Sequence, residues 1–141
     1  MDPIVVGTDG SPGAEAAIRK SIELAGGSGA TVHLVAAYPG RSTLERLGMT
    51  ARQDTIDMRG VAMDVLARDE RRFTEAGFTV EKHAREGDPA DAILDVAEER
   101  DADLIVVGNK GMSGAKRFLL GSVPNKVSHH APCSVLIVRT T

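Results

Sequence analysis

The chain has 141 residues, which is enough for one folded domain with a core and too short for two ordinary domains. It is 42% hydrophobic and 26% charged, with a formal net charge of −3, so it has no general attraction to nucleic acid or to anionic lipid. Aromatic residues are scarce, with three Phe, one Tyr and no Trp, which argues against single-stranded nucleic-acid binding through stacked bases.

Cys133 is the single cysteine, so an internal disulfide is excluded. No basic and then apolar signal segment opens the sequence, and no apolar run approaches the ~20 residues of a membrane span. These features predict a cytoplasmic protein that contacts no membrane. Cys133 has no evident activating base nearby in the sequence, so we expect an unreactive thiol.

Short apolar segments alternate with helical patterns along the chain. Residues 4–7 predict a buried strand, and the next helix begins with Ser11 as its cap and Pro12 as its first residue. The glycines of segment 26–29 end this helix, and residues 31–37 predict a second buried strand.

The next stretch has no clear pattern until about Gln53, where a long helical pattern begins and runs to Gly77. We expect one side of this helix to be apolar, formed by Ile56, Met63, Leu66 and Phe73. Residues 78–84 alternate apolar and polar side chains, which is typical of an edge strand.

The last third of the chain repeats the alternation. Asp88 and Pro89 open a helix, and residues 103–108 predict a buried strand. A Gly-rich segment leads to a helix over about 122–130, and residues 134–139 predict the last strand. The β-α-β-α-β-α-β-α-β order predicts one domain, residues 1–141, with a mainly parallel sheet and helices on both faces.

Two loops are the candidate binding segments, because ligands of open parallel sheets bind outside the carboxyl ends of the strands. The first is segment 7–9, after the first strand, and the second runs from Gly108 to Ser122. Gly108 and Gly111 allow a sharp turn and a close approach of the backbone to a ligand. Gly121 and Ser122 stand at a helix start, where free N–H groups and the positive dipole end can bind phosphate without basic side chains.

The spacing Gly108-x2-Gly111-x9-Gly121-Ser122 matches the ATP-binding signature of the universal stress protein family. The opening Val-Gly-Thr-Asp-Gly-Ser and the closing Ser-Val-Leu-Ile-Val carry the resemblance over the whole chain. The chain therefore resembles the nucleotide-binding branch of that family. The resemblance implies a Rossmann-like open five-stranded sheet in the order 3-2-1-4-5 and a homodimer, which often pairs through the last strand, here 134–139.

The resemblance also implies roles for individual residues. Asp9 is similar to an acidic residue near the ribose and the metal-bound phosphates, with Mg²⁺ or Mn²⁺ as the metal. Ala36 resembles the position whose backbone reads adenine. The positions implied to bind nucleotide are Gly7, Thr8, Asp9, Ala36, Gly108, Gly111, Gly121, Ser122, Val123 and Pro124. Pro124 departs from members with Thr there, because it has neither a hydroxyl nor an N–H to donate.

Binding of ATP by a dimeric regulatory switch in the stress response is the function that the resemblance implies. The alternative to a binding protein is an enzyme, either a phosphotransferase or an ATPase. However, the sequence has no GxxxxGK[ST] loop and no obvious catalytic base, so we assign no catalytic residue and leave only slow hydrolysis or autophosphorylation open. Cyclic AMP in place of ATP also stays open. The intact glycine signature disfavours the nucleotide-free branch, and a receiver domain would need an acidic pair where only Asp9 stands.

A few other polar residues have open or structural interpretations. Lys110, Lys116 and Arg117 lie in the Gly-rich segment and could either contact the terminal phosphate or be solvated. We expect His33 to be packed in the core rather than to be a ligand. His129 and His130 end a helix, where the dipole favours cations.

Overall fold

The computed structural model describes residues 1–46, 48, 57–110 and 120–140 of the chain. The five strands are β1 (Ile4–Gly7), β2 (Thr31–Tyr38), β3 (Thr79–Glu86), β4 (Leu104–Gly108) and β5 (Ser134–Val138). They form one sheet in the order β3-β2-β1-β4-β5, and all neighbouring pairs are parallel. The Rossmann-like order implied by the family resemblance is confirmed.

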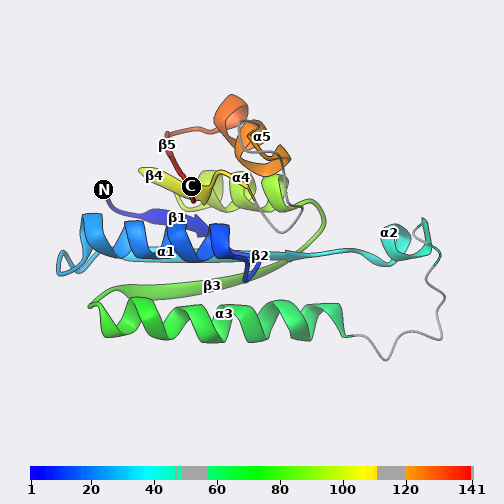
Figure 1. Cartoon of the computed structure of the whole chain (residues 1–141), viewed down its shortest axis with the longest axis horizontal. Helices are drawn as coiled ribbons and strands as arrows, with labels where there is room; N and C mark the ends of the chain where they lie inside the picture. Colours follow the sequence, from blue (N-terminus) through cyan, green and yellow to red (C-terminus); the bar gives the residue numbers. More distant parts are fainter. Residues whose placement is uncertain (47, 49–56, 111–119, 141) are drawn as a thin grey trace.

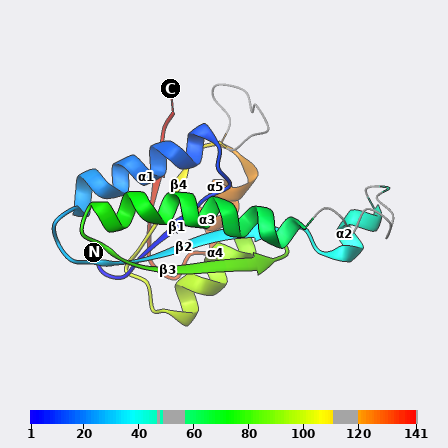
Figure 2. The same ribbon diagram turned by 90° about the horizontal axis from the view of Figure 1, so that it is seen from below.

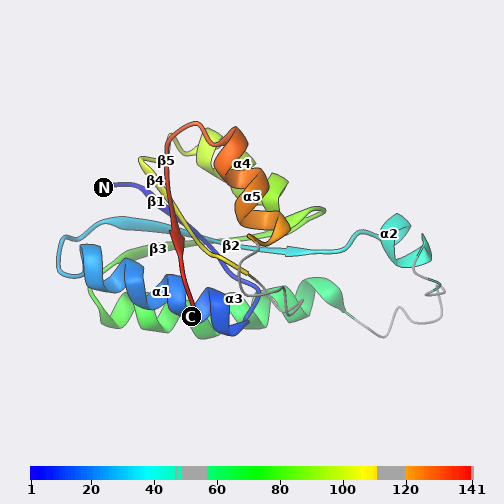
Figure 3. The same ribbon diagram turned by 45° about the horizontal axis from the view of Figure 1, so that its top comes forward.

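The helices are α1 (Pro12–Ala25), α2 (Arg41–Arg46), α3 (Met58–Glu75), α4 (Pro89–Glu99) and α5 (Ser122–His130). Helices α1 and α3 cover one face of the sheet, while α4 and α5 cover the other (Figures 1 and 3). Figure 2 shows α1 and α3 running side by side across their face. Helix α2 stands apart from these layers in all three views.

Alternation along the buried strands divides the core into two clusters, because successive side chains point to opposite faces. Val6 and Leu34 pack with α1 and α3, and Val5 and Ile105 pack with α4 and α5. These apolar, β-branched strands are therefore buried on both faces, as expected of a parallel sheet.

Local capping signals account for where the helices begin and end. The hydroxyl of Ser11 accepts a hydrogen bond from the N–H of Ala14 at 3.3 Å, and the carboxylate of Asp88 accepts one from Asp91 at 3.0 Å. Gly77 follows α3 with a φ of +90°, which is the left-handed conformation that favours glycine at a helix end. The predicted helix boundaries at Ser11, Gly77 and Asp88 are confirmed.

One prediction about the middle of the chain is wrong. The sequence placed Met63 on the apolar side of α3, but its side chain is 40% exposed. The buried stripe of α3 is instead formed by Ala62, Leu66, Asp69 and Phe73. Met63 follows Ala62 by one position, which turns it about 100° around the helix and away from the sheet. The short helix α2 also lies in a stretch for which no element was predicted, and Ile56 lies outside the described residues.

The two edges of the sheet differ in chemistry. Strand β3, predicted as an edge strand, lies at one edge and carries charged residues at 81, 82, 85 and 86. Strand β5 lies at the other edge and is mainly apolar. Across the part of the chain that the structure describes, no helix combines the length and apolar character needed to cross a membrane.

Candidate functional site

An open cavity lies at the carboxyl ends of the central strands, where α1, α4 and α5 meet them. Its volume is about 190 Å³, many times the 10–15 Å³ that one water needs by the same measure. Its walls are formed by Gly7, Thr8, Asp9, Ser11, Ala14, Val35, Ala37, Pro89, Ile93, Val107, Gly108, Lys110, Gly121, Ser122, Val123 and Pro124. We call this space the strand-end cavity. Both candidate segments from the sequence border it.

Thr8 and Asp9 lead the chain from β1 into α1. The hydroxyl of Thr8 donates to the buried carboxylate of Asp69 at 2.7 Å, so this hydroxyl is directed to α3. The exposed carboxylate of Asp9 accepts a hydrogen bond from the N–H of Ser11 at 2.9 Å. Asp9 therefore braces the turn before α1 and borders the cavity at the same time. Asp69 was not identified from the sequence, where it reads as one charge among many on a polar helix.

Gly108 ends β4 against the first turn of α1. A Cβ at Gly108 would lie 2.5 Å from the carbonyl oxygen of Gly13, and a Cβ at Gly13 would lie 2.1 Å from that of Lys110. These two glycines therefore let the helix approach the strand end backbone to backbone. The sequence assigned Gly108 to ligand approach; in the structure it borders the cavity, and close helix packing also requires it to be glycine.

Helix α5 begins at the cavity without a side-chain cap. The N–H of Gly121 donates to the carbonyl of Asn109 at 2.8 Å, so this amide is already used inside the protein. Pro124 is buried and has no N–H. Among the described residues, none accepts a hydrogen bond from the N–H groups of Ser122 or Val123. Both amides belong to the first turn of the helix, at the positive end of its dipole.

Asn109 holds this end of the sheet together. Its buried side-chain oxygen accepts from the N–H of Thr140 at 3.2 Å and from the Thr140 hydroxyl at 3.1 Å. Its backbone bonds Val138 on one side and Gly121 on the other. The segment 108–110 and the start of α5 are thereby fixed relative to β5. No sequence signal identified this role, because it depends on contacts with residues distant in the chain.

Part of the cavity wall is apolar. Val35, Ala37, Ile93 and Val107 line it. Ala36, the position implied to read adenine, is buried with its side chain in the cluster on the α1 and α3 face, and its neighbours Val35 and Ala37 border the cavity. A backbone contact from Ala36 stays a prediction.

Of the basic residues in the Gly-rich segment, Lys110 lines the cavity. Gly111, Lys116 and Arg117 lie outside the described residues. Cys133 is partly buried, and burial raises the pKa of its thiol, with the Asp103 charge adding to the effect. The prediction of an unreactive thiol agrees with this direction.

Comparison with known proteins bears on the whole chain. The family model described as "Universal stress protein family" matches residues 1–139. The chain belongs to the universal stress protein family. Its nearly full-length relatives include the universal stress protein Rv1636 of Mycobacterium tuberculosis, which is 37% identical over 98% of this chain and 96% of its own length.

Two solved universal stress proteins carry an adenine nucleotide. One, in complex with cAMP, is 35% identical with a TM-score of 0.72 and covers 98% of this chain and 97% of its own. The other, from Archaeoglobus fulgidus in complex with dAMP, is 30% identical with a TM-score of 0.70 and covers 98% of both chains. These universal stress proteins share both fold and detectable sequence similarity with this chain.

Proposed function

We propose that this protein binds an adenine nucleotide, with ATP as the leading candidate, in the strand-end cavity and acts as a cytoplasmic regulator of the stress response. The observation that carries the proposal is the start of α5. There the first two residues of the helix, Ser122 and Val123, line a cavity whose wall also carries aliphatic side chains. The family membership and the nucleotide complexes of two relatives support the same conclusion.

The polar side of the cavity suits a phosphate group. The N–H groups of Ser122 and Val123 can each donate a charge-assisted hydrogen bond, worth about 1.5–3 kcal/mol. The dipole of α5 adds up to about 2 kcal/mol. Lys110 supplies a positive charge from the cavity wall. The two hydrogen bonds and the dipole together contribute about 3–8 kcal/mol, and once the cost of association is subtracted they fall short of the roughly 8 kcal/mol of micromolar affinity.

The apolar wall can supply the remainder by covering the base. Val35, Ala37 and Ile93 offer aliphatic surface to a planar ring. Burial of about 100 Å² of apolar surface contributes about 2.5 kcal/mol. Neither half of the cavity suffices alone, so the proposal favours a ligand that has both a base and a phosphate.

The acidic residue at the cavity rim, Asp9, can bind a metal ion together with the nucleotide phosphates. Asp9 presents an exposed carboxylate beside the cavity, and carboxylates with phosphate oxygens are the ligands that Mg²⁺ prefers. In this proposal Asp9 and the nucleotide phosphates share Mg²⁺ or Mn²⁺. The ion would neutralise the repulsion between the carboxylate and a triphosphate.

The regulatory part of the proposal is a homodimer that pairs through β5. This strand lies at the edge of the sheet and its central residues are half-buried and apolar. Its end is tied to the cavity through Asn109, which bonds Val138, Thr140 and Gly121. A nucleotide at the start of α5 can thus act on the edge strand through this connection.

Cyclic AMP is a second candidate, since a solved relative of 35% identity has this ligand bound. The two candidates differ in charge and in the need for a metal. We expect isothermal titration calorimetry to give tighter binding of ATP than of cyclic AMP in the presence of Mg²⁺. The reverse order, unchanged by a chelator, would assign the cavity to the cyclic nucleotide.

The amides of α5 can be tested with two substitutions of one residue. Ser122→Pro removes the first N–H of the helix, at a position that favours proline. Gly121 before it has an extended conformation, with φ −62° and ψ 163°, that proline accepts. Ser122→Ala removes the hydroxyl and keeps the N–H. We expect Ser122→Pro to weaken ATP binding by roughly 10-fold or more, and Ser122→Ala to do so much less. If the two variants bound ATP equally well, the backbone amide of Ser122 would not be a ligand of the nucleotide.

A further inference from the structure

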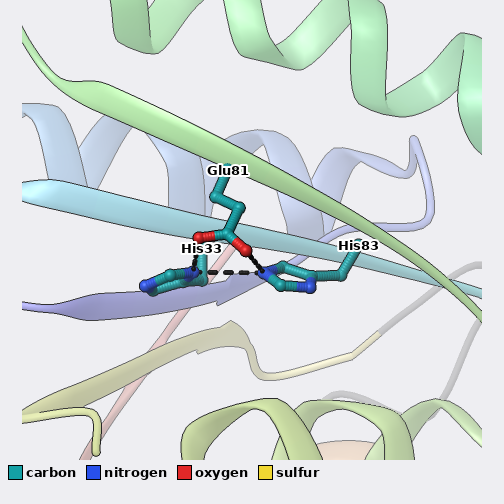
Figure 4. A group of neighbouring side chains, drawn as sticks. All are labelled: His33, Glu81 and His83. Atoms are coloured by element: carbon teal, nitrogen blue, oxygen red, sulfur yellow. Dashed lines mark hydrogen bonds and ion pairs between the residues drawn. The ribbon is translucent and has the colours of Figure 1, made fainter. Parts of the chain in front are cut away.

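Two histidines and one glutamate meet on the half of the sheet formed by β2 and β3, and none of them lines the strand-end cavity. The backbone pairs His33 with Glu81 and Val35 with His83. Because alternate residues of a strand face the same side, all three side chains project from one face. Figure 4 shows them converging.

The face is that of α4, at the opposite side of the sheet from α3. Lys82, between the two β3 residues of the group, pairs with Glu70 of α3. Glu81 instead pairs with Arg100, the residue that caps the end of α4. His33, Glu81 and His83 therefore lie on the face of the sheet next to the end of α4, and we call them the His–Glu–His cluster.

The spacing of the potential ligand atoms is close to that around a tetrahedral ion. The Nδ1 atom of His33 lies 3.1 Å from Nε2 of His83. Oε2 of Glu81 lies 3.4 Å from Nδ1 of His33, and Oε1 of Glu81 lies 3.7 Å from Nε2 of His83. Bonds of about 2.0–2.1 Å at tetrahedral angles separate ligand atoms by about 3.3–3.4 Å. No other group of three such side chains comes this close together in the described part of the chain.

The cluster combines rigid, neutral imidazoles with an accessible carboxylate. The side chains of His33 and His83 are each 6% exposed, whereas that of Glu81 is 43% exposed. Burial lowers the pKa of both histidines, against the opposing effect of Glu81. Neutral imidazole is the form that binds a metal ion. Glu81 contributes a negative charge and leaves one side open for entry of the ion.

A hydrogen bond between the two rings leaves the cluster incompletely paired. One proton can bridge Nδ1 of His33 and Nε2 of His83. That proton is then used, so neither of these nitrogens has a proton left for Glu81. Oε1 of Glu81 is paired with Arg100 instead, and Oε2 faces Nδ1 of His33. A divalent cation satisfies all three groups together.

We propose that His33, Glu81 and His83 bind a divalent transition-metal ion, with Zn²⁺ as the ion that the donor set favours. Two imidazoles and one carboxylate suit zinc and leave a fourth position for water. Arg100 holds Oε1 of Glu81, so Oε2 is the oxygen directed to the ion. The sequence predicted a packed core position for His33; its burial is confirmed, and the proposal adds a ligand role.

The bound ion links the edge strand β3 to β2. One of its proposed ligands, His83, pairs with Val35 of β2, and Val35 lines the strand-end cavity. The site is nevertheless independent of nucleotide, because its three ligands belong to the protein. Its test therefore needs no nucleotide and can fail while the proposed function stands.

The test uses the fact that the chain has four histidines. The other two, His129 and His130, are exposed at the end of α5 and could bind Zn²⁺ adventitiously. The double variant His129→Gln/His130→Gln keeps His33 and His83 alone and serves as the background. Zn²⁺ is titrated into this protein in competition with a chromophoric chelator, and Co²⁺ absorption reports the coordination geometry. We expect one ion per chain, a tetrahedral Co²⁺ spectrum and a higher melting temperature with Zn²⁺.

In that background, His33→Gln and His83→Gln should each weaken Zn²⁺ binding by at least about 100-fold, because loss of a direct ligand exceeds the 10–100-fold loss for an outer partner. Circular dichroism in the presence of chelator checks that each variant is folded. Glu81→Gln, at a half-exposed position, leaves the buried rings unaltered and removes the negative charge while keeping an amide oxygen as ligand, so we expect the smaller loss of roughly 10-fold. A background protein that binds no Zn²⁺, or ligand variants with unchanged affinity, would show that the cluster is only a hydrogen-bonded pair beside a glutamate.

Discussion

Asp9 has two separable roles at the end of β1. One carboxylate oxygen accepts the hydrogen bond from the N–H of Ser11 that shapes the turn into α1. The side chain is also exposed at the rim of the strand-end cavity. Removal of the whole side chain would disturb both roles, so the metal-linked role must be tested by a change of charge alone.

Asp9→Asn keeps the oxygen that accepts from Ser11 and removes the negative charge. We expect it to weaken ATP binding roughly 10-fold with Mg²⁺ present, because the ion loses a carboxylate ligand. With chelator present, binding should be unchanged or slightly tighter, since a negative charge near the phosphates is gone. Calorimetry under both conditions measures the difference. Equal weakening with and without Mg²⁺ would contradict a metal-linked role, and Asp9→Ala shows the added cost of losing the turn.

The pair Gly13 and Gly108 decides how closely α1 packs on the end of β4. Neither glycine has a left-handed backbone, so conformational freedom does not explain them. The contact distances do: the space for a Cβ at either position is occupied by a backbone carbonyl. A backbone atom cannot rotate aside as a side chain can, so any larger residue must displace the helix.

Gly13→Ala should therefore destabilise the protein, although alanine is intrinsically better than glycine in a helix by about 1 kcal/mol. We expect the free energy of unfolding to fall by about 1–3 kcal/mol from the steric overlap with the carbonyl of Lys110. Gly7→Ala is the matched control, because its Cβ would meet the flexible end of the Ile93 side chain at 2.5 Å. Urea denaturation should show the smaller loss for Gly7→Ala. A smaller loss for Gly13→Ala would mean that α1 shifts freely.

At the scale of elements, the features readable from the sequence are those with local causes. The runs 4–7 and 104–108 are strands because they are short, β-branched and apolar. Ser11 and Asp88 begin helices because their side chains accept from N–H groups three residues later. Each of these signals lies within a few residues of its effect.

The features that the sequence did not reveal depend on long-range contacts. Asp69 is buried in α3 because Thr8, 61 positions away, donates to it. The His33–His83 contact joins residues 50 positions apart and depends on the register of β2 with β3. The helical periodicity of α3 was recognisable, but its rotation about its own axis was not. That rotation is set by packing against the sheet, and it exposes Met63.

For the whole molecule, the two edges of the sheet determine how copies can associate. An unpaired edge strand exposes backbone donors and acceptors that can pair with another chain. On β3 the residues Glu81, Lys82, Arg85 and Glu86 place charges along the edge, which opposes such pairing. On β5 the sequence is Ser-Val-Leu-Ile-Val, with three half-buried apolar residues at its centre. The proposed homodimer is therefore more compatible with β5 than with β3.

Val135→Lys places a charge on the β5 edge, and the aliphatic part of the lysine side chain can still cover the surface that valine covers. We expect light scattering coupled to size-exclusion chromatography to give twice the 14.9 kDa of one chain for the unmodified protein and a single chain for the variant. Thr79→Lys adds the same charge to the exposed start of β3 and should leave the dimer intact. If both variants stayed dimeric and folded, pairing would have to use another surface. A monomeric unmodified protein would contradict the proposed homodimer.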